Sequence, residues 1–173
     1  NPSDDVEARA AVKAAYEYDG PVYLRFGRLA VPVINDREDY KFEMGKGVVL
    51  REGKDLTIVV SGLPVANCLE VAKKLSAEGI EAKVINIHTI KPLDEDLIVA
   101  AAKETGKVVT VEEHSVIGGL GSAVCDALSA KAPTQVLKIG VNDVFGESGP
   151  ALELLKKYGL DTDGIYEKVK AFL

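Results

Sequence analysis

Residues 56–87 read LTIVVSGLPVANCLEVAKKLSAEGIEAKVINI and predict a strand, a helix and a second strand. Leu56 to Ser61 is a short run rich in β-branched residues, and Ala82 to Ile87 is a second apolar run. Gly79 ends the helix between them. Apolar residues recur in that helix at the spacing of one buried face, at Val65, Cys68, Leu69, Ala72 and Leu75. This stretch therefore predicts one unit of a largely parallel sheet covered by helices.

The alternation continues toward the C-terminus. Asp94 is placed to cap a helix that ends at Gly106, and Val108 to Val111 follows as a buried strand. Further elements are predicted as helices at Gly121 to Ala130, Ala151 to Tyr158 and Ile165 to Phe172, and as a fifth strand at Gln135 to Ile139. Right-handed crossovers distribute such helices over both faces of a sheet. Residues 41–173 are therefore predicted to form one three-layer α/β/α domain with a five-stranded, mostly parallel sheet.

One strand of this sheet is expected to be antiparallel. Gly47 to Arg51 is predicted as the first strand, and Glu52-Gly53-Lys54-Asp55 joins it to the strand that begins at Leu56. A connection of four residues is of hairpin length. We therefore expect the first two strands to pair with each other.

Residues 1–40 do not make a domain by themselves. Asp4 to Glu17 is predicted as a helix, with Asp4 as its cap and Glu7 at the reciprocal capping position. Val22 to Arg25 is predicted as a short strand. Because one helix and one strand cannot close a sheet, we expect residues 1–40 to be the end of a larger domain and a linker, so that the chain starts in mid-domain.

The composition limits the classes of function. The net charge is −6 and the lysines are dispersed among acidic residues, which argues against binding of nucleic acid. No apolar run approaches the roughly 20 residues of a membrane helix, so a soluble, cytoplasmic protein is expected. Cys68 and Cys125 fall in predicted helices and favour burial over a disulfide or a metal site.

Two motifs follow the strand that ends at Val111. Glu112-Glu113-His114 is expected at the carboxyl edge of the sheet, where it would exchange protons or form a polar edge or subunit contact. Gly118-Gly119-Leu120-Gly121-Ser122 opens the next helix, where its amides would hold an anion or pack closely. A dinucleotide site is rejected, because Val124 stands where the third glycine of the fingerprint belongs.

Arg25 and Arg28 bracket Phe26-Gly27 directly after the predicted strand Val22 to Arg25. Both guanidinium groups are expected to project from the strand end into a cleft. Phosphate or carboxylate would be their natural ligand there. From the residues alone, ordinary surface ion pairs remain the alternative.

Several blocks of the chain, in order and at similar spacing, resemble the C-terminal region of the transketolase family. The blocks span nearly the whole chain and are specific in combination. They are Gly20-Pro21-Val22-Tyr23-Leu24-Arg25 with Arg28, Thr89-Ile90-Lys91-Pro92-Leu93-Asp94, Thr110-Val111-Glu112-Glu113-His114 with Gly118-Gly119-Leu120-Gly121, and Phe145-Gly146-Glu147-Ser148-Gly149.

The resemblance implies a transferase that uses thiamine diphosphate and a divalent metal, Mg or Ca, to move a two-carbon ketol unit between sugar phosphates, as in the pentose phosphate pathway. Residues 1–40 would be the tail of its pyrimidine-binding domain, and residues 41–173 its C-terminal domain, which serves assembly of a homodimer. The family's phosphate-binding arginine corresponds to Arg28, four residues before Pro32, and Arg25 would support the same site.

Departures from the family pattern limit the expected activity. The Gly-Asp-Gly and Asn signature for the diphosphate and metal is absent, as is the glutamate that activates the aminopyrimidine. No catalytic, cofactor-binding or metal-binding residue is therefore assigned, and the chain without the remaining N-terminal portion is predicted to be inactive, a truncation being preferred over a natural split. The alternatives are the C-terminal domain of deoxyxylulose-phosphate synthase or of a 2-oxoacid dehydrogenase β subunit, and a noncatalytic docking module.

Overall fold

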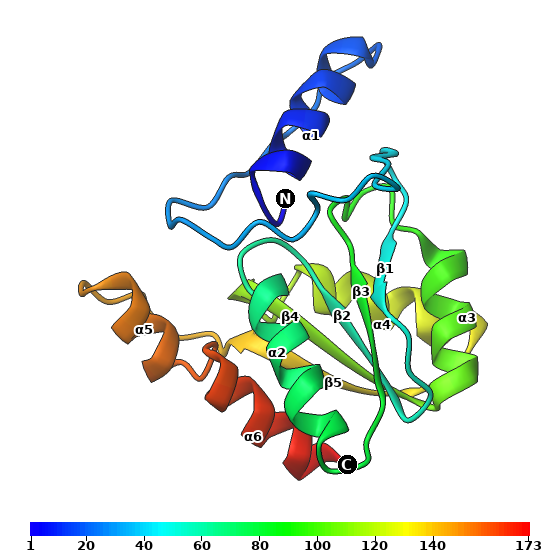
Figure 1. Ribbon diagram of the computed structural model, residues 1–173, viewed down its shortest axis with the longest axis vertical. Helices are drawn as coiled ribbons and strands as arrows, with labels where there is room; N and C mark the ends of the chain where they lie inside the picture. Colours follow the sequence, from blue (N-terminus) through cyan, green and yellow to red (C-terminus); the bar gives the residue numbers. More distant parts are fainter.

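A five-stranded mixed sheet forms the centre of the computed structural model, which describes residues 1–173 (Figure 1). The strand order is β1-β3-β2-β4-β5, and only the pair of β1 with β3 is antiparallel. The strands are β1 (Val48–Arg51), β2 (Leu56–Val60), β3 (Ala82–Asn86), β4 (Lys107–Ser115) and β5 (Gln135–Val141). The predicted mostly parallel sheet with one antiparallel strand is confirmed.

Helices cover both faces of this sheet. One face packs against α2 (Val65–Ser76) and α6 (Thr162–Phe172), and the other packs against α3 (Glu95–Thr105) and α4 (Leu120–Lys131) (Figure 1). Every residue of β2 and β3 is buried, as expected for central strands covered on both sides. Alternate residues of β2 separate the two cores, because Ile58 and Val60 belong to the first and Val59 to the second. The three-layer architecture is confirmed.

The expected pairing of the first two strands is wrong, because β3 lies between β1 and β2. The amides of Lys54 and Asp55 both donate to the carbonyl oxygen of Glu81, at 3.0 Å each. The connection between β1 and β2 therefore passes over the beginning of β3. Gly53 allows this close approach, because a Cβ there would overlap the backbone of Ala82 and Lys83.

Two predicted elements near the site have different bounds. Residues 22–25 form no strand, because no neighbouring strand lies beside them to supply a ladder of hydrogen bonds. In contrast, β4 continues past Val111 to Ser115, so that Glu112-Glu113-His114 belongs to the strand itself. These residues extend beyond β2, whose pairing with β4 ends at Val111.

α1 (Asp5–Glu17) projects away from the sheet, and α5 (Ala151–Lys157), which has no buried residue, lies at the edge of the molecule (Figure 1). The cap predicted for α1 is confirmed, because the Glu7 amide donates to Asp4 Oδ1 at 2.9 Å. Large apolar side chains stay exposed on α1 and in the loop before α5, with Tyr16 90% and Phe145 97% exposed. None of the helices combines the length and the apolar character that crossing a bilayer requires.

Candidate functional site

The segment that carries both predicted arginines crosses the carboxyl edge of the sheet. Residues 18–46 connect α1 to β1 and contain no helix or strand. A Cβ at Gly27 would lie 3.9 Å from Leu63, which follows β2. The amide of Ile34 donates to Asp4 Oδ2 at 2.8 Å. The segment therefore passes over the edge at which open α/β sheets bind ligands.

Arg25 is held at the end of β4. Its Nη1 and Nη2 atoms donate to Glu113 Oε2, at 3.4 and 3.5 Å, and Nη1 also lies 3.5 Å from Asn1 Oδ1. Both side chains of the ion pair are partly shielded, with 29% of Arg25 and 28% of Glu113 exposed. The guanidinium group of Arg25 is thus already engaged by a carboxylate of the chain.

Arg28 has a different environment. It is exposed and has no hydrogen bond or ion pair with any residue of the chain. The structure therefore does not join Arg28 to the cluster around Arg25. Its guanidinium group keeps all five donors available for an external anion.

The amides of the glycine-rich turn bind the side chain of Glu112. Its carboxylate is 2% exposed and accepts hydrogen bonds from the amides of Leu120 and Gly121, each at 2.8 Å. These amides belong to the first residues of α4, where the helix dipole favours a negative charge. Gly119 leaves room for this contact, because a Cβ there would lie 2.9 Å from Glu112 Cδ and closer still to Oε2. The anion at this helix terminus is a residue of the chain.

His114 is half-buried and lies near the Arg25 guanidinium. Burial, and then the charge of Arg25, lower the pKa of His114 below its ordinary value, although Glu112 and Glu113 partly oppose the shift. The imidazole has no hydrogen bond or ion pair within the chain. The lowered pKa favours the neutral imidazole, and the chain offers it no hydrogen-bonded partner for proton exchange.

A second polar cluster at the same edge joins α1 to the sheet. Glu7 is fully buried and accepts hydrogen bonds from Ser3, Asn86 and Tyr40. His88, which is 3% exposed, stacks on Phe42 with ring centroids 4.2 Å apart. Sequence reasoning assigned Glu7 only to helix capping and gave no role to the other residues. The spacing of Asp4 and Glu7 was the one sequence signal for this cluster. It does not reveal the partner of Glu7 on β3, Asn86.

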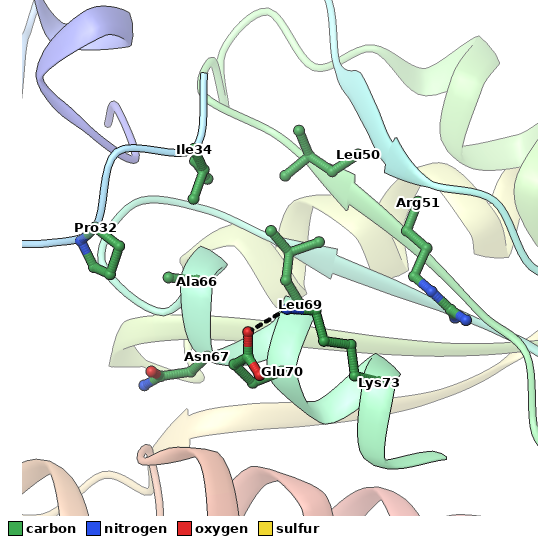
Figure 2. A pocket seen from close by; sticks show the side chains of 9 residues that line it. All are labelled: Pro32, Ile34, Leu50, Arg51, Ala66, Asn67, Leu69, Glu70 and Lys73. Atoms are coloured by element: carbon green, nitrogen blue, oxygen red, sulfur yellow. Dashed lines mark hydrogen bonds and ion pairs between the residues drawn. The ribbon is translucent and has the colours of Figure 1, made fainter. Parts of the chain in front are cut away.

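An open pocket of about 410 Å³ lies between the segment before β1, β1 itself and α2 (Figure 2). Neither Arg25 nor Arg28 lines it, so this pocket is not the cleft predicted for the two arginines. The charged groups at its rim are already paired, Arg51 with Glu81 and Lys73 with Glu70. The lining residues are Pro32, Ile34, Leu50, Arg51, Ala66, Asn67, Leu69, Glu70 and Lys73.

Comparison with protein families matches residues 45–165 to the transketolase C-terminal domain. A curated relative from Methanocaldococcus jannaschii, described as a putative transketolase C-terminal section, is 42% identical over 170 residues, which cover 97% of this chain and 53% of the relative. The 1-deoxy-D-xylulose-5-phosphate synthase 1 of Geobacter sulfurreducens is 40% identical over 177 residues, covering 99% of this chain and 28% of that protein.

A solved structure is similar over nearly the whole chain. It is described as a split gene transketolase, inactive β4 tetramer, and superposes with a TM-score of 0.92 at 53% sequence identity. The match covers 98% of this chain and 55% of the solved chain. The present chain thus spans about half the length of this protein and of the relative from Methanocaldococcus jannaschii.

Proposed function

This chain belongs to the transketolase family, and we propose that it is the C-terminal part of a thiamine-diphosphate-dependent enzyme that transfers a two-carbon ketol unit between sugar phosphates. Its contribution to that enzyme is twofold. The α/β domain provides surface for assembly, and Arg28 binds the phosphate of the sugar. The observation that carries this proposal is the unpaired, exposed guanidinium group of Arg28 next to an arginine that is already paired.

The residues of this chain do not fit the cofactor. Thiamine diphosphate needs a divalent metal held by oxygen ligands, and no group of three or more His, Cys, Asp or Glu side chains converges on one point. The glycine-rich helix terminus, that of α4, already holds the Glu112 carboxylate. In our proposal the remaining N-terminal portion of the enzyme therefore holds both cofactor and metal, and this chain without it has no activity.

Assembly with that portion, and into a homodimer, agrees with the exposed apolar side chains. Tyr16 and Tyr23 are 90% and 89% exposed at the N-terminal side, and Phe145 and Leu152 are 97% and 71% exposed before and within α5. Exposed apolar side chains that gather into a patch mark contact regions. We propose that these two regions are covered in the complete, cytoplasmic enzyme.

The phosphate contact accounts for orientation of the substrate. A guanidinium fork binds two phosphate oxygens at once, which fixes the direction of the sugar as well as its position. Glu113 already occupies the guanidinium group of Arg25. We therefore assign the direct phosphate contact to Arg28 and a supporting role to Arg25.

The test compares two arginine variants in the complete enzyme, formed by this chain with its N-terminal portion. Arg28→Ala is expected to raise the KM of a ketose phosphate by about 30-fold or more, because loss of a charged contact costs about 2 to 5 kcal/mol. The KM of the same ketose without its phosphate should not change. Arg9→Ala is the matched control, because Arg9 is an exposed arginine on α1. Equal effects on both sugars would remove the assignment of Arg28.

A second candidate is 1-deoxyxylulose-5-phosphate synthase, favoured by the 40% identity to the Geobacter sulfurreducens enzyme. The product decides between the two. Formation of a 1-deoxy sugar phosphate by the complete enzyme would support the synthase, whereas transfer of a ketol unit between two sugar phosphates would support transketolase. A stable complex without turnover of either kind would indicate a docking module.

A further inference from the structure

The segment that carries Arg28 has almost no polar attachment of its own. None of the backbone hydrogen bonds of the chain involves residues 21–33, and these residues form no helix or strand. Only one side chain in this stretch, that of Arg25, makes a hydrogen bond or ion pair with the rest of the chain. The direction in which the segment leaves the sheet edge therefore depends on how Arg25 is held.

Glu113, the partner of Arg25, belongs to a strand of the central sheet. It lies in the part of β4 that extends beyond β2, between Val111 and Ser115, which pair with Ile139 and Val141 of β5. The preceding residue, Glu112, is buried and bound to two amides of α4. Because Glu112 and Ser115 on either side are bound to the fold, the backbone of Glu113 is held at the carboxyl edge.

The environment strengthens this ion pair relative to a fully exposed one. Less than a third of either side chain is open to solvent. Most surface ion pairs contribute little to stability, because water and salt compete with them. Partial shielding reduces this competition. Three peptide units separate the Cα atoms of the two arginines, which limits these atoms to about 10 Å apart in the most extended case. Holding Arg25 therefore confines Arg28 as well.

We infer that Glu113 is a positioning residue for substrate phosphate, acting through its ion pair with Arg25 on the placement of Arg28. Glu113 itself does not contact the substrate. The inference rests on the proposed function, because it assumes that Arg28 binds phosphate in the complete enzyme. It assigns the C-terminal domain a part in substrate recognition in addition to assembly.

The kinetic test uses Glu113→Gln in the complete enzyme. We expect the KM of a ketose phosphate to rise about fivefold, the equivalent of about 1 kcal/mol for a partly shielded ion pair. The kcat, and the KM of the unphosphorylated ketose, should stay unchanged. Glu167→Gln on α6 is the matched control, because Glu167 is exposed and unpaired, and it should behave as the wild type.

A charge exchange separates positioning from simple damage to the fold. The double variant Arg25→Glu with Glu113→Arg restores the ion pair in the opposite sense, so it should recover most of the lost affinity for phosphate, whereas each single change should not. An unchanged KM in Glu113→Gln, a lower KM caused by a freed Arg25, an equal rise for both sugars, or no recovery in the double variant would each overturn the inference.

A protease readout keeps this inference distinct from the proposed function. Trypsin cleaves after arginine, and the ion pair shields Arg25 from it. In the complete enzyme, Glu113→Gln should speed cleavage after Arg25 relative to cleavage after Arg28, measured by the masses of the fragments. If Arg28→Ala leaves phosphate affinity intact, the proposed function fails. If Arg28→Ala weakens it while Glu113→Gln changes neither the KM nor the cleavage ratio, only the positioning role fails.

Discussion

Asn86 donates hydrogen bonds from Nδ2 to both carboxylate oxygens of Glu7, at 2.8 and 3.1 Å, and so joins the end of β3 to α1. Glu7 also accepts hydrogen bonds from the Ser3 amide at 2.7 Å and from the Tyr40 hydroxyl at 2.9 Å. A carboxylate without solvent exposure is stable only when donors surround it. Glu7 therefore provides the main buried polar link between α1 and β3.

Glu7→Ala is expected to lower the free energy of unfolding by about 3 kcal/mol, because several buried donors would lose their acceptor. Urea denaturation of this chain measures the loss. Glu17→Ala is the matched control, because Glu17 is exposed on the same helix and should change stability by less than about 0.5 kcal/mol. Equal midpoints for the two variants would show that the buried cluster does not hold α1.

Local patterns predicted most of the fold because each element has its own period and its own end signals. Asp94 and Gly106 bound α3 as expected, with Asp94 accepting from the Leu97 amide and Gly106 in the left-handed conformation. The partner of β1 was not predictable in this way. The length of a connection limits how far apart two strand ends lie, but it does not show that β3 enters between them.

The candidate site was less predictable than the fold, because its contacts join residues that are far apart in the sequence. The sequence singled out Arg25 as a residue with an unusual position, yet its partner Glu113 lies 88 residues away. Glu112 and the glycine-rich turn were both noticed, but separately. The hydrogen bond between the Leu120 amide and Glu112 spans eight residues, and it depends on the continuation of β4 past Val111, which the sequence pattern does not indicate. The role of Arg28 in binding phosphate stays a prediction.

Glu112→Ala should lower the free energy of unfolding by about 2 to 3 kcal/mol, because the amides of Leu120 and Gly121 would be left buried without an acceptor. Glu112→Gln should cost less, since its amide oxygen can still accept one of these hydrogen bonds. The neighbouring Glu113→Ala is the control and should cost at most about 1 kcal/mol. Thermal unfolding followed by circular dichroism would measure all three. A larger loss for Glu113→Ala than for Glu112→Ala would contradict the capping role.

Gly119→Ala should act on the same contact from the other side. The new Cβ would displace the Glu112 carboxylate from α4, so we expect a loss of about 2 kcal/mol. Gly118→Ala is a useful comparison, because a Cβ there meets no neighbour and costs only the strain of φ +76°, about 1 kcal/mol. In the double variant Gly119→Ala with Glu112→Ala the losses should not add, since both changes remove one interaction. Additive losses would place the two residues in independent contacts.

The pH dependence of stability should reveal the burial of His88. Burial lowers the pKa of His88 below its ordinary value of 6.5, because desolvation disfavours the imidazolium, and the charge of Glu7 only partly opposes this. Above pH 6.5 the imidazole is neutral in both states, and its contribution to stability is fully present. As the pH falls below 6.5, the unfolded chain binds a proton that the folded chain does not, so the free energy of unfolding decreases.

We therefore expect the free energy of unfolding of the wild type to fall between pH 7.5 and 5.5 by about 1 kcal/mol more than that of His88→Phe, which keeps a ring against Phe42 but cannot titrate. Urea denaturation across this range gives both curves. His114→Asn should remove a smaller part of the slope, because His114 is only half-buried, although its pKa is also lowered by burial and by Arg25. Parallel curves for the wild type and His88→Phe would mean that His88 takes up its proton as easily in the folded chain as in the unfolded one.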